Sequence, residues 1–212
     1  MNDVSTEGLV GLWLSGAEQG RAGRDASGRE HHGIVTGAIW GEHDGRHGLH
    51  FDGNGQSVDI PAAPGLEIER DIAIAAWIWK DRPNDGERWD AILSKTPGVW
   101  DYELLTSKAR SDEPAFYSRP CEPNEVYAGS EVPARTWVHV AMTRRGAEVS
   151  FFVNGGLAGT SVMEGAFSRS GGVLQIGHDG AQANGGMHGW LSKVALYDRA
   201  LDGDEVAALA SS

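Results

Sequence analysis

Residues 136–162 constrain the fold more than any other part of the chain. They contain two apolar runs rich in β-branched residues, which flank a turn at Gly146, and the second run ends at Asn154-Gly155. Asn-Gly is the strongest short signal for a tight β-hairpin, because both residues tolerate the positive φ values that a type I′ turn requires. We therefore predict three consecutive antiparallel strands in this stretch.

The rest of the chain repeats short apolar segments separated by turns. The 30 glycines among 212 residues provide many positions where a tight turn can form. Residues 72–79 are apolar on both faces of a strand, which predicts burial on both sides. Further strands are expected at residues 8–14, 34–35, 38–40, 48–51, 56–60, 91–95, 102–106, 173–177 and 187–197. Residues 107–135 give weaker signals for two or three short strands.

Only the end of the chain has helical character. Asp202 and Glu205 have the spacing of a capping box, and Val206 and Leu209 supply an apolar face. No linker, repeat or low-complexity tract interrupts the pattern. The sequence therefore predicts one all-β domain over residues 1–212, with about fourteen short strands in two sheets and a short C-terminal helix.

The charge of the chain limits its partners. The formal net charge is −12, which disfavours nucleic acid and anionic membranes. A strongly acidic polysaccharide would need a local basic patch or a cation. The single cysteine, Cys121, excludes an intrachain disulfide. Neither a signal peptide nor a membrane-spanning run is recognisable, so the compartment stays open, with an extracellular location expected if this is an excised or mature module.

The motifs, taken in order, resemble the laminin G-like domains of the concanavalin A-like lectin/glucanase superfamily. They include Gly8-Leu-Val-Gly-Leu-Trp13, Asp25-Ala-Ser-Gly28, Gly48-Leu-His-Phe-Asp-Gly53, Ile74-Ala-Ala-Trp77, Ile92-Leu-Ser-Lys95, Trp137-Val-His-Val-Ala141, Phe152-Val-Asn-Gly155, Leu174-Gln-Ile-Gly177 and Leu196-Tyr-Asp-Arg-Ala-Leu201. The resemblance implies a β-sandwich jelly roll of two antiparallel sheets, one of them concave. It also implies a glycan-binding or interaction module that is usually not catalytic.

The resemblance raises the question of a structural calcium ion, which many relatives hold. Their pattern has an acidic residue after the first strand and an Asp in the last strand, where this sequence has Ser15 and Ser192. Ca²⁺ prefers several oxygen ligands, usually including carboxylates. Asp25 is the candidate metal ligand that remains.

Tryptophan gives the clearest indication of a ligand. Of the eight tryptophans, Trp13, Trp77, Trp137 and Trp190 match family positions and are expected in the core. Trp79 ends the buried strand at residues 72–79, and Trp89 and Trp100 are expected in loops among polar residues. An indole face stacks well on the apolar face of a sugar. We predict a non-catalytic module that binds a neutral or weakly charged glycan at one shared rim. The predicted ligand-binding residues are Trp79, Arg88, Trp89, Trp100, Asp101, His178, Asp179 and Asn184.

Three other interpretations stay open. The loop tryptophans could simply fold back over the edge of the sandwich, or the same aromatic rim could bury at an interface with other protein chains. A glycan hydrolase or lyase would instead use Glu67 and Glu69, or the histidine cluster between His43 and His50. Alternate carboxylates on a strand lie about 6.6 Å apart, and a retaining glycosidase needs about 5–5.5 Å between them. A solvated acidic loop is the simpler explanation of residues 67–71, and we predict no catalytic residue.

Overall fold

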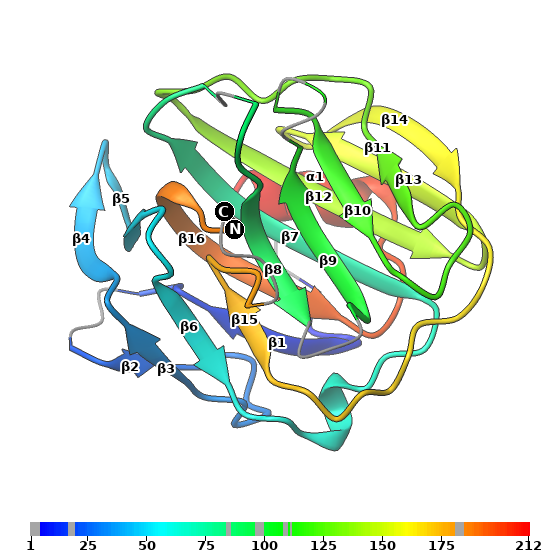
Figure 1. The fold of residues 1–212 in the computed structure, drawn as a ribbon, viewed down its shortest axis with the longest axis horizontal. Helices are drawn as coiled ribbons and strands as arrows, with labels where there is room; N and C mark the ends of the chain where they lie inside the picture. Colours follow the sequence, from blue (N-terminus) through cyan, green and yellow to red (C-terminus); the bar gives the residue numbers. More distant parts are fainter. Residues whose placement is uncertain are drawn as a thin grey trace.

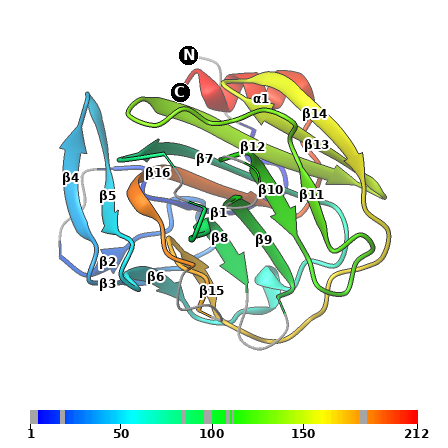
Figure 2. The ribbon, with the colours of Figure 1, turned by 45° about the horizontal axis from the view of Figure 1, so that its top comes forward.

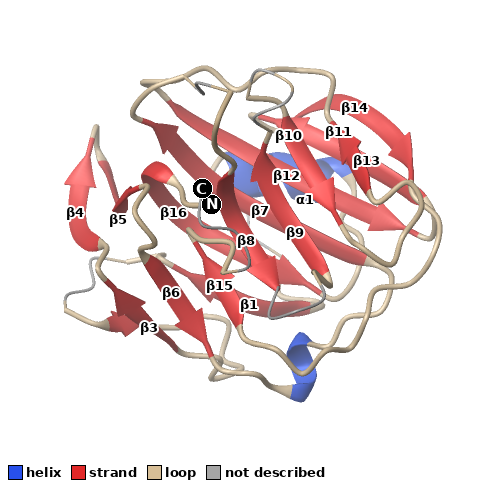
Figure 3. Ribbon diagram, viewed as in Figure 1, coloured by secondary structure: helices blue, strands red, loops and turns tan. Residues whose placement is uncertain are grey.

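The computed structural model describes residues 5–16, 20–83, 86–95, 100–107, 110, 112–180 and 185–212. Its strands form two antiparallel sheets of eight strands each, which pack face to face (Figure 1 and Figure 2). The helical elements are the 3-10 helix η1 (Pro64–Leu66) and the helix α1 (Gly203–Ala210), drawn in blue in Figure 3. The predicted β-sandwich jelly roll with a C-terminal helix is confirmed. No helix in the described ranges is long and apolar enough to cross a membrane.

The first sheet, called sheet A here, has the order β14-β13-β12-β7-β16-β5-β4, and β1 also pairs with β16. Its strands are β1 (Leu9–Trp13), β4 (Ile39–His43), β5 (Arg46–Asp52), β7 (Ile72–Lys80), β12 (Trp137–Arg145), β13 (Glu148–Val153), β14 (Gly156–Val162) and β16 (His188–Tyr197).

The second sheet, called sheet B, has the order β11-β10-β9-β8-β15-β6-β3-β2. Its strands are β2 (Ala22–Gly23), β3 (Gly33–Thr36), β6 (Ser57–Ile60), β8 (Asp90–Lys95), β9 (Tyr102–Thr106), β10 (Pro114–Tyr117), β11 (Glu125–Tyr127) and β15 (Leu174–Ile176).

The meander predicted from residues 136–162 forms β12, β13 and β14 at the edge of sheet A. Asn154 and Gly155 have φ values of 50° and 79°, as a type I′ turn requires. The other edge of β12 pairs along its length with β7, which places the meander next to the most apolar strand of the sequence. The local signal therefore positions one half of sheet A.

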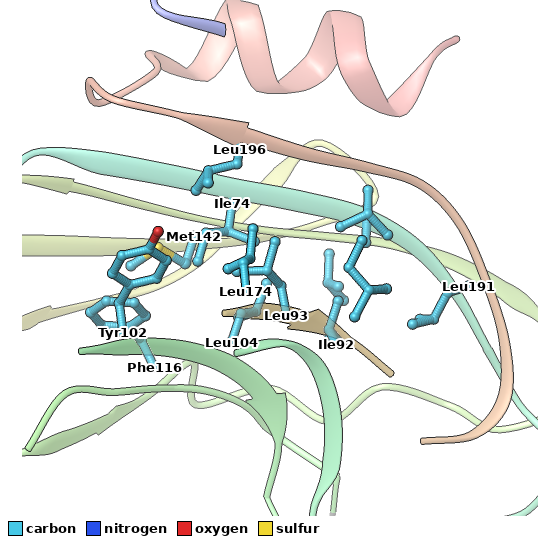
Figure 4. Packing of buried hydrophobic residues seen from close by; sticks show 14 of the residues in the cluster. Ile74, Ile92, Leu93, Tyr102, Leu104, Phe116, Met142, Leu174, Leu191 and Leu196 are labelled. Carbon is cyan, nitrogen blue, oxygen red and sulfur yellow. The ribbon is translucent and has the colours of Figure 1, made fainter. Parts of the chain in front are cut away.

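The hydrophobic core lies between the two sheets (Figure 4). Sheet A contributes Ile74 and Met142, and sheet B contributes Leu93, Leu104 and Phe116, all of which are fully buried. These positions alternate along their strands with residues that face outward, as the two-residue period of a strand requires. Each sheet therefore has one apolar inner face and one outer face of mixed character.

A buried cation joins the two sheets at one end of the core. Lys80 is 1% exposed, and its Nζ lies 2.6 Å from a carboxylate oxygen of Asp90 in sheet B. A second ion pair joins the same Nζ to Asp112. Two carboxylates for one ammonium group keep the buried charge paired, which offsets the cost of removing these ions from water.

Helix α1 covers part of the outer face of sheet A, on the far side from sheet B (Figure 2). Small residues such as Ala73 and Ala75 allow the helix to approach, and Leu209 packs against them. The predicted capping box is present, because Asp202 accepts from the backbone N–H of Glu205 and the Glu205 side chain accepts from that of Asp202.

The tryptophans of sheet A correct one prediction. Trp13 is fully buried in the core, but Trp77, Trp137 and Trp190 are half-buried on the outer face of sheet A. Strand alternation gives the reason: Trp77 lies on the same face of β7 as the alanines under α1, and Trp79 pairs in register with both Trp137 and Trp190. The β4–β5 hairpin packs over them, since Trp137 Nε1 donates to the carbonyl of His43 at 2.8 Å.

Candidate functional site

A row of polar side chains crosses the outer face of sheet B. Strand register places neighbouring members of the row directly opposite one another, on five adjacent strands. Their neighbours along the strands, such as Leu104 and Phe116, belong to the core, so the row faces outward. We call this set the polar row; its members are Gln175 (β15), Ser94 (β8), Glu103 (β9), Tyr117 (β10) and Glu125 (β11).

Trp100 lies beside the polar row, in the connection between β8 and β9. Its ring centre is 6.2 Å from that of Tyr117 at an interplanar angle of 81°, an edge-to-face arrangement. The guanidinium of Arg119 lies 5.2 Å from the centre of the Trp100 ring. Both aromatic rings are half-buried, so each keeps an accessible surface.

Asp179 connects Trp100 to the loop that follows β15. Trp100 Nε1 donates a 3.4 Å hydrogen bond to Asp179 Oδ2. The loop is held against the row because the backbone N–H of Gly180 donates to Gln175 Oε1 at 3.0 Å. The same loop closes on itself through a bridge between His178 and Gly186. An indole, a phenol, an amide and carboxyl groups therefore converge on one surface.

Glu103 is the most unusual member of the polar row. It is 1% exposed, and its Oε1 has no hydrogen-bond partner among the described residues. Burial raises the pKa of Glu103 well above its usual range, and the charges of Asp179 and Glu125 raise it further, while the Ser94 hydroxyl opposes them. A protonated carboxyl group can both donate and accept a hydrogen bond. Burial also raises the pKa of Glu125.

The structure brings together only some of the predicted ligand-binding residues. Trp100 and Asp179 meet over the polar row, and His178 lies in the same loop. Asn184 lies outside the described residues. Asp101 is fully buried: its Oδ2 lies 2.9 Å from Lys95 Nζ and accepts from the Ser170 hydroxyl at 2.6 Å. These contacts anchor Asp101, just before β9, on its buried side.

The remaining predicted residues lie elsewhere. Arg88, near the other end of β8, donates from Nη1 to the carbonyl of Gly53 at 3.0 Å, and the neighbouring Trp89 is half-buried. Trp79 lies on the outer face of sheet A, 6.1 Å from Trp137 by ring centres. Trp79 and Trp100 are thus on opposite faces of the sandwich. The prediction that the three tryptophans share one rim has to be corrected, because the parity of β7 turns Trp79 away from sheet B.

Most residues of the polar row, and Arg119, are absent from the ligand-binding residues predicted from the sequence. Glu103 gave a usable signal, since a carboxylate between the apolar residues Tyr102 and Leu104 in a strand must face away from the core. Tyr117, Arg119 and Gln175 gave none, because their meeting depends on pairing between distant strands.

Asp25, the predicted metal ligand, accepts hydrogen bonds on both carboxylate oxygens. Its Oδ1 accepts from the backbone N–H groups of Leu12 and Ser27, and its Oδ2 accepts from the Ser27 hydroxyl and the His31 N–H. Burial tends to raise the pKa of Asp25, but these hydrogen bonds outweigh it and lower the pKa. Within the described ranges, no group of three or more His, Cys, Asp or Glu side chains is arranged to hold a metal ion.

The candidate catalytic groups from the sequence do not join the polar row. Glu67 lies 2.8 Å from Lys95 Nζ, and the exposed Glu69 pairs with Arg169 at 3.1 Å. His50 belongs to sheet A, where its Nε2 lies 2.8 Å from Asp81. These residues occupy separate parts of the surface.

Comparison with known proteins identifies the fold family. A family model described as the concanavalin A-like lectin/glucanases superfamily matches residues 52–207. Comparison with curated protein sequences found no match.

Solved structures share the fold at low sequence identity. Domain 4 of AbnA, a GH43 extracellular arabinanase from Geobacillus stearothermophilus, in complex with arabinotriose, has a TM-score of 0.73 at 15% identity, covering 95% of this chain and 98% of that one. The binding domain of Paraclostridial Mosquitocidal Protein 1 has a TM-score of 0.74 at 13% identity, covering 97% and 52%. Trypanosoma rangeli sialidase in complex with the inhibitor DANA has a TM-score of 0.67 at 22% identity, covering 99% and 33%. This chain thus spans about half the length of the mosquitocidal protein chain and about a third of the length of the sialidase chain.

Proposed function

Because the chain belongs to the concanavalin A-like lectin/glucanase superfamily, we propose that it is a non-catalytic carbohydrate-binding module whose ligand binds over the polar row of sheet B. The observation that carries the proposal is the pairing of accessible aromatic rings with buried polar groups. Trp100 and Tyr117 offer apolar surface to the C–H face of a sugar, and Glu103 and Gln175 lie within the same row.

The polar groups indicate how such a ligand would be oriented. Glu103 Oε1 has no partner among the described residues, and burying a polar atom without one costs free energy. A sugar hydroxyl would supply the missing hydrogen bond. The likeness to an arabinanase domain in complex with arabinotriose supports a sugar of this kind as the first candidate.

The charges of the site favour a neutral or weakly charged glycan. The site contains three carboxyl groups that interact electrostatically, because the charges of Asp179 and Glu125 raise the pKa of Glu103. Two cations lie near this group: Arg119 stacks over Trp100, and the charge of Arg110 lowers the pKa of Glu125. An anionic sugar would approach three carboxyl groups and would be repelled when they are ionised.

The test is binding to a panel of neutral oligosaccharides that includes arabinotriose, by calorimetry and affinity gel electrophoresis. Burial of one aromatic side chain contributes about 1.5–3 kcal/mol, so Trp100→Ala and Tyr117→Ala should each weaken binding by about ten- to hundredfold. Trp79→Ala, on the opposite face, is the matched control and should leave binding unchanged. Glycan binding that survives both substitutions in sheet B at full affinity would refute this site.

One observation favours a second candidate, a glycan hydrolase. A carboxyl group whose pKa is raised by burial, next to a second carboxylate, is the arrangement that glycosidases use as acid and base. Glu103 and Asp179 would then be the pair. Release of reducing ends from a bound glycan, abolished in Glu103→Gln while binding persists, would establish this activity; binding without release supports the module.

A further inference from the structure

A cavity separate from the polar row lies on the outer face of sheet A, next to α1. It has a volume of about 130 Å³ and opens between the C-terminal end of α1 and the β4–β5 hairpin. The described residues that line it are Leu12, Ser15, Ala75, Trp77, His139, Lys193, Leu209 and Ser212. The whole sandwich separates this cavity from the polar row.

The wall of the cavity is mainly apolar. Leu12, Ala75, Leu209 and the indole of Trp77 are its apolar lining residues. A dry apolar cavity of about 150 Å³ is large enough to hold benzene. The space therefore fits the body of a small organic molecule with about six carbons, and it is too small for an oligosaccharide.

The rim of the cavity is positively charged. Lys193 lines it, and the guanidinium of Arg46 stacks on Trp77 at 3.8 Å from the ring centre. Burial lowers the pKa of Lys193, and repulsion from the nearby charge of Arg46 lowers it further. Both cations make only long contacts with Ser212. Arg46 Nη1 lies 3.4 Å from its backbone oxygen, and Lys193 Nζ lies 3.5 Å from its hydroxyl oxygen. None of the described lining residues is Asp or Glu.

Two hydrogen-bonding groups in the wall lack partners. Trp77 Nε1 and His139 Nδ1 are both buried without a hydrogen bond among the described residues, and His139 is 2% exposed. Native proteins satisfy the large majority of buried polar atoms, so two orphans beside one cavity point to an absent partner. Burial and then the charge of Arg46 lower the pKa of His139 to about 4, so the imidazole is neutral near pH 7. Its Nδ1 can then donate or accept, according to the tautomer.

We propose that this cavity binds a small amphipathic carboxylate. The apolar body packs against Leu12, Ala75 and Leu209, and the carboxylate group faces Lys193 and Arg46. The indole N–H of Trp77 supplies a hydrogen bond to the bound carboxylate. The chemistry follows from three features of the cavity: the apolar wall selects the body, the two cations select a negative head, and the volume limits the size.

The experiment uses benzoate as the probe and follows the backbone and indole N–H signals of the intact protein by NMR during titration. We expect saturable shifts at the Trp77 indole and at residues around Lys193. Benzyl alcohol, which has the same ring without the charge, should bind at least tenfold more weakly. Lys193→Met and Arg46→Met, which keep the length of an aliphatic side chain, should each weaken benzoate binding about tenfold.

The controls separate this site from general surface effects and from the proposed glycan site. Arg169→Met removes an exposed cation elsewhere and should leave benzoate binding unchanged. Trp100→Ala should also leave it unchanged, so that failure of the glycan site and failure of this cavity are independent results. Shifts that do not saturate, equal affinity for benzyl alcohol, or full affinity in both methionine variants would overturn the proposal.

Discussion

Replacement of Glu103 by Gln should make the protein more stable at neutral and alkaline pH and leave it unchanged in acid. Glu103 is 1% exposed, and burial followed by the charges of Asp179 and Glu125 raises its pKa well above the usual range. The folded state therefore binds this proton more tightly than the unfolded chain does. The stability of the wild type falls, relative to a neutral residue, as the pH rises from the unfolded pKa to the folded one.

The magnitude follows from proton linkage. Within that window the difference in unfolding free energy between Glu103→Gln and wild type grows by about 1.4 kcal/mol for each pH unit. For a domain of this size 1 kcal/mol corresponds to about 2–4 °C in Tm, so the two melting temperatures should separate by about 3–6 °C per pH unit. Below the unfolded pKa of about 4.3 both side chains are neutral, and the curves should meet.

Circular dichroism melting curves between pH 4 and pH 9 provide the measurement. Glu131→Gln is the control, because Glu131 is exposed and its substitution should give no growing separation. Gln can donate and accept hydrogen bonds as a protonated Glu does, so glycan affinity should persist in Glu103→Gln and lose its pH dependence. Wild-type and Glu103→Gln profiles that run parallel over the whole range would show that Glu103 is ionised as readily as a surface residue, and the argument would fail.

Three further predictions concern the scaffold, and urea unfolding checks each of them. Lys80→Met should destabilise the protein by about 3–5 kcal/mol, because it leaves two carboxylates buried near each other without their cation. Gly189→Ala should lower the free energy of unfolding by at least about 3 kcal/mol, because the φ of Gly189 is 145° and a Cβ there would lie 1.9 Å from the carbonyl oxygen of Trp79. Gly146→Ala is the comparison; it has open space around it and should lower that free energy by about 1 kcal/mol. Asp202→Ala should cost about 1 kcal/mol through loss of the helix cap; unchanged midpoints would contradict each argument in turn.

The parts of the fold that depend on neighbouring residues could be predicted from the sequence. The hairpin at Asn154 and Gly155 and the cap at Asp202 are both encoded within a few positions. The apolar strand at β7 was equally visible, because it has no polar residue between Ile72 and Trp79. Each of these signals is a local preference that tertiary packing reinforces.

The candidate site depends on information that no short stretch contains. Glu103 faces Tyr117 and Ser94 only because three strands pair in one particular register. A shift of one residue would turn these side chains into the core. The position of Trp79 could not be predicted from the sequence for a related reason. Alternation places Trp79 on the same face of β7 as Trp77, but packing across the whole chain decides which face of β7 turns toward sheet B.

The two proposed sites show that net charge describes the whole chain and not each surface. The net charge of −12 argues against anionic ligands, and the carboxyl groups around Glu103 agree with it. Arg46 and Lys193 nevertheless gather at one cavity on the other face. The two sets of charges lie on opposite outer faces of the sandwich, so a ligand that approaches either face meets the charges of that face at the shortest distance. A neutral glycan and a small carboxylate can therefore be selected by opposite local charges on a single sandwich.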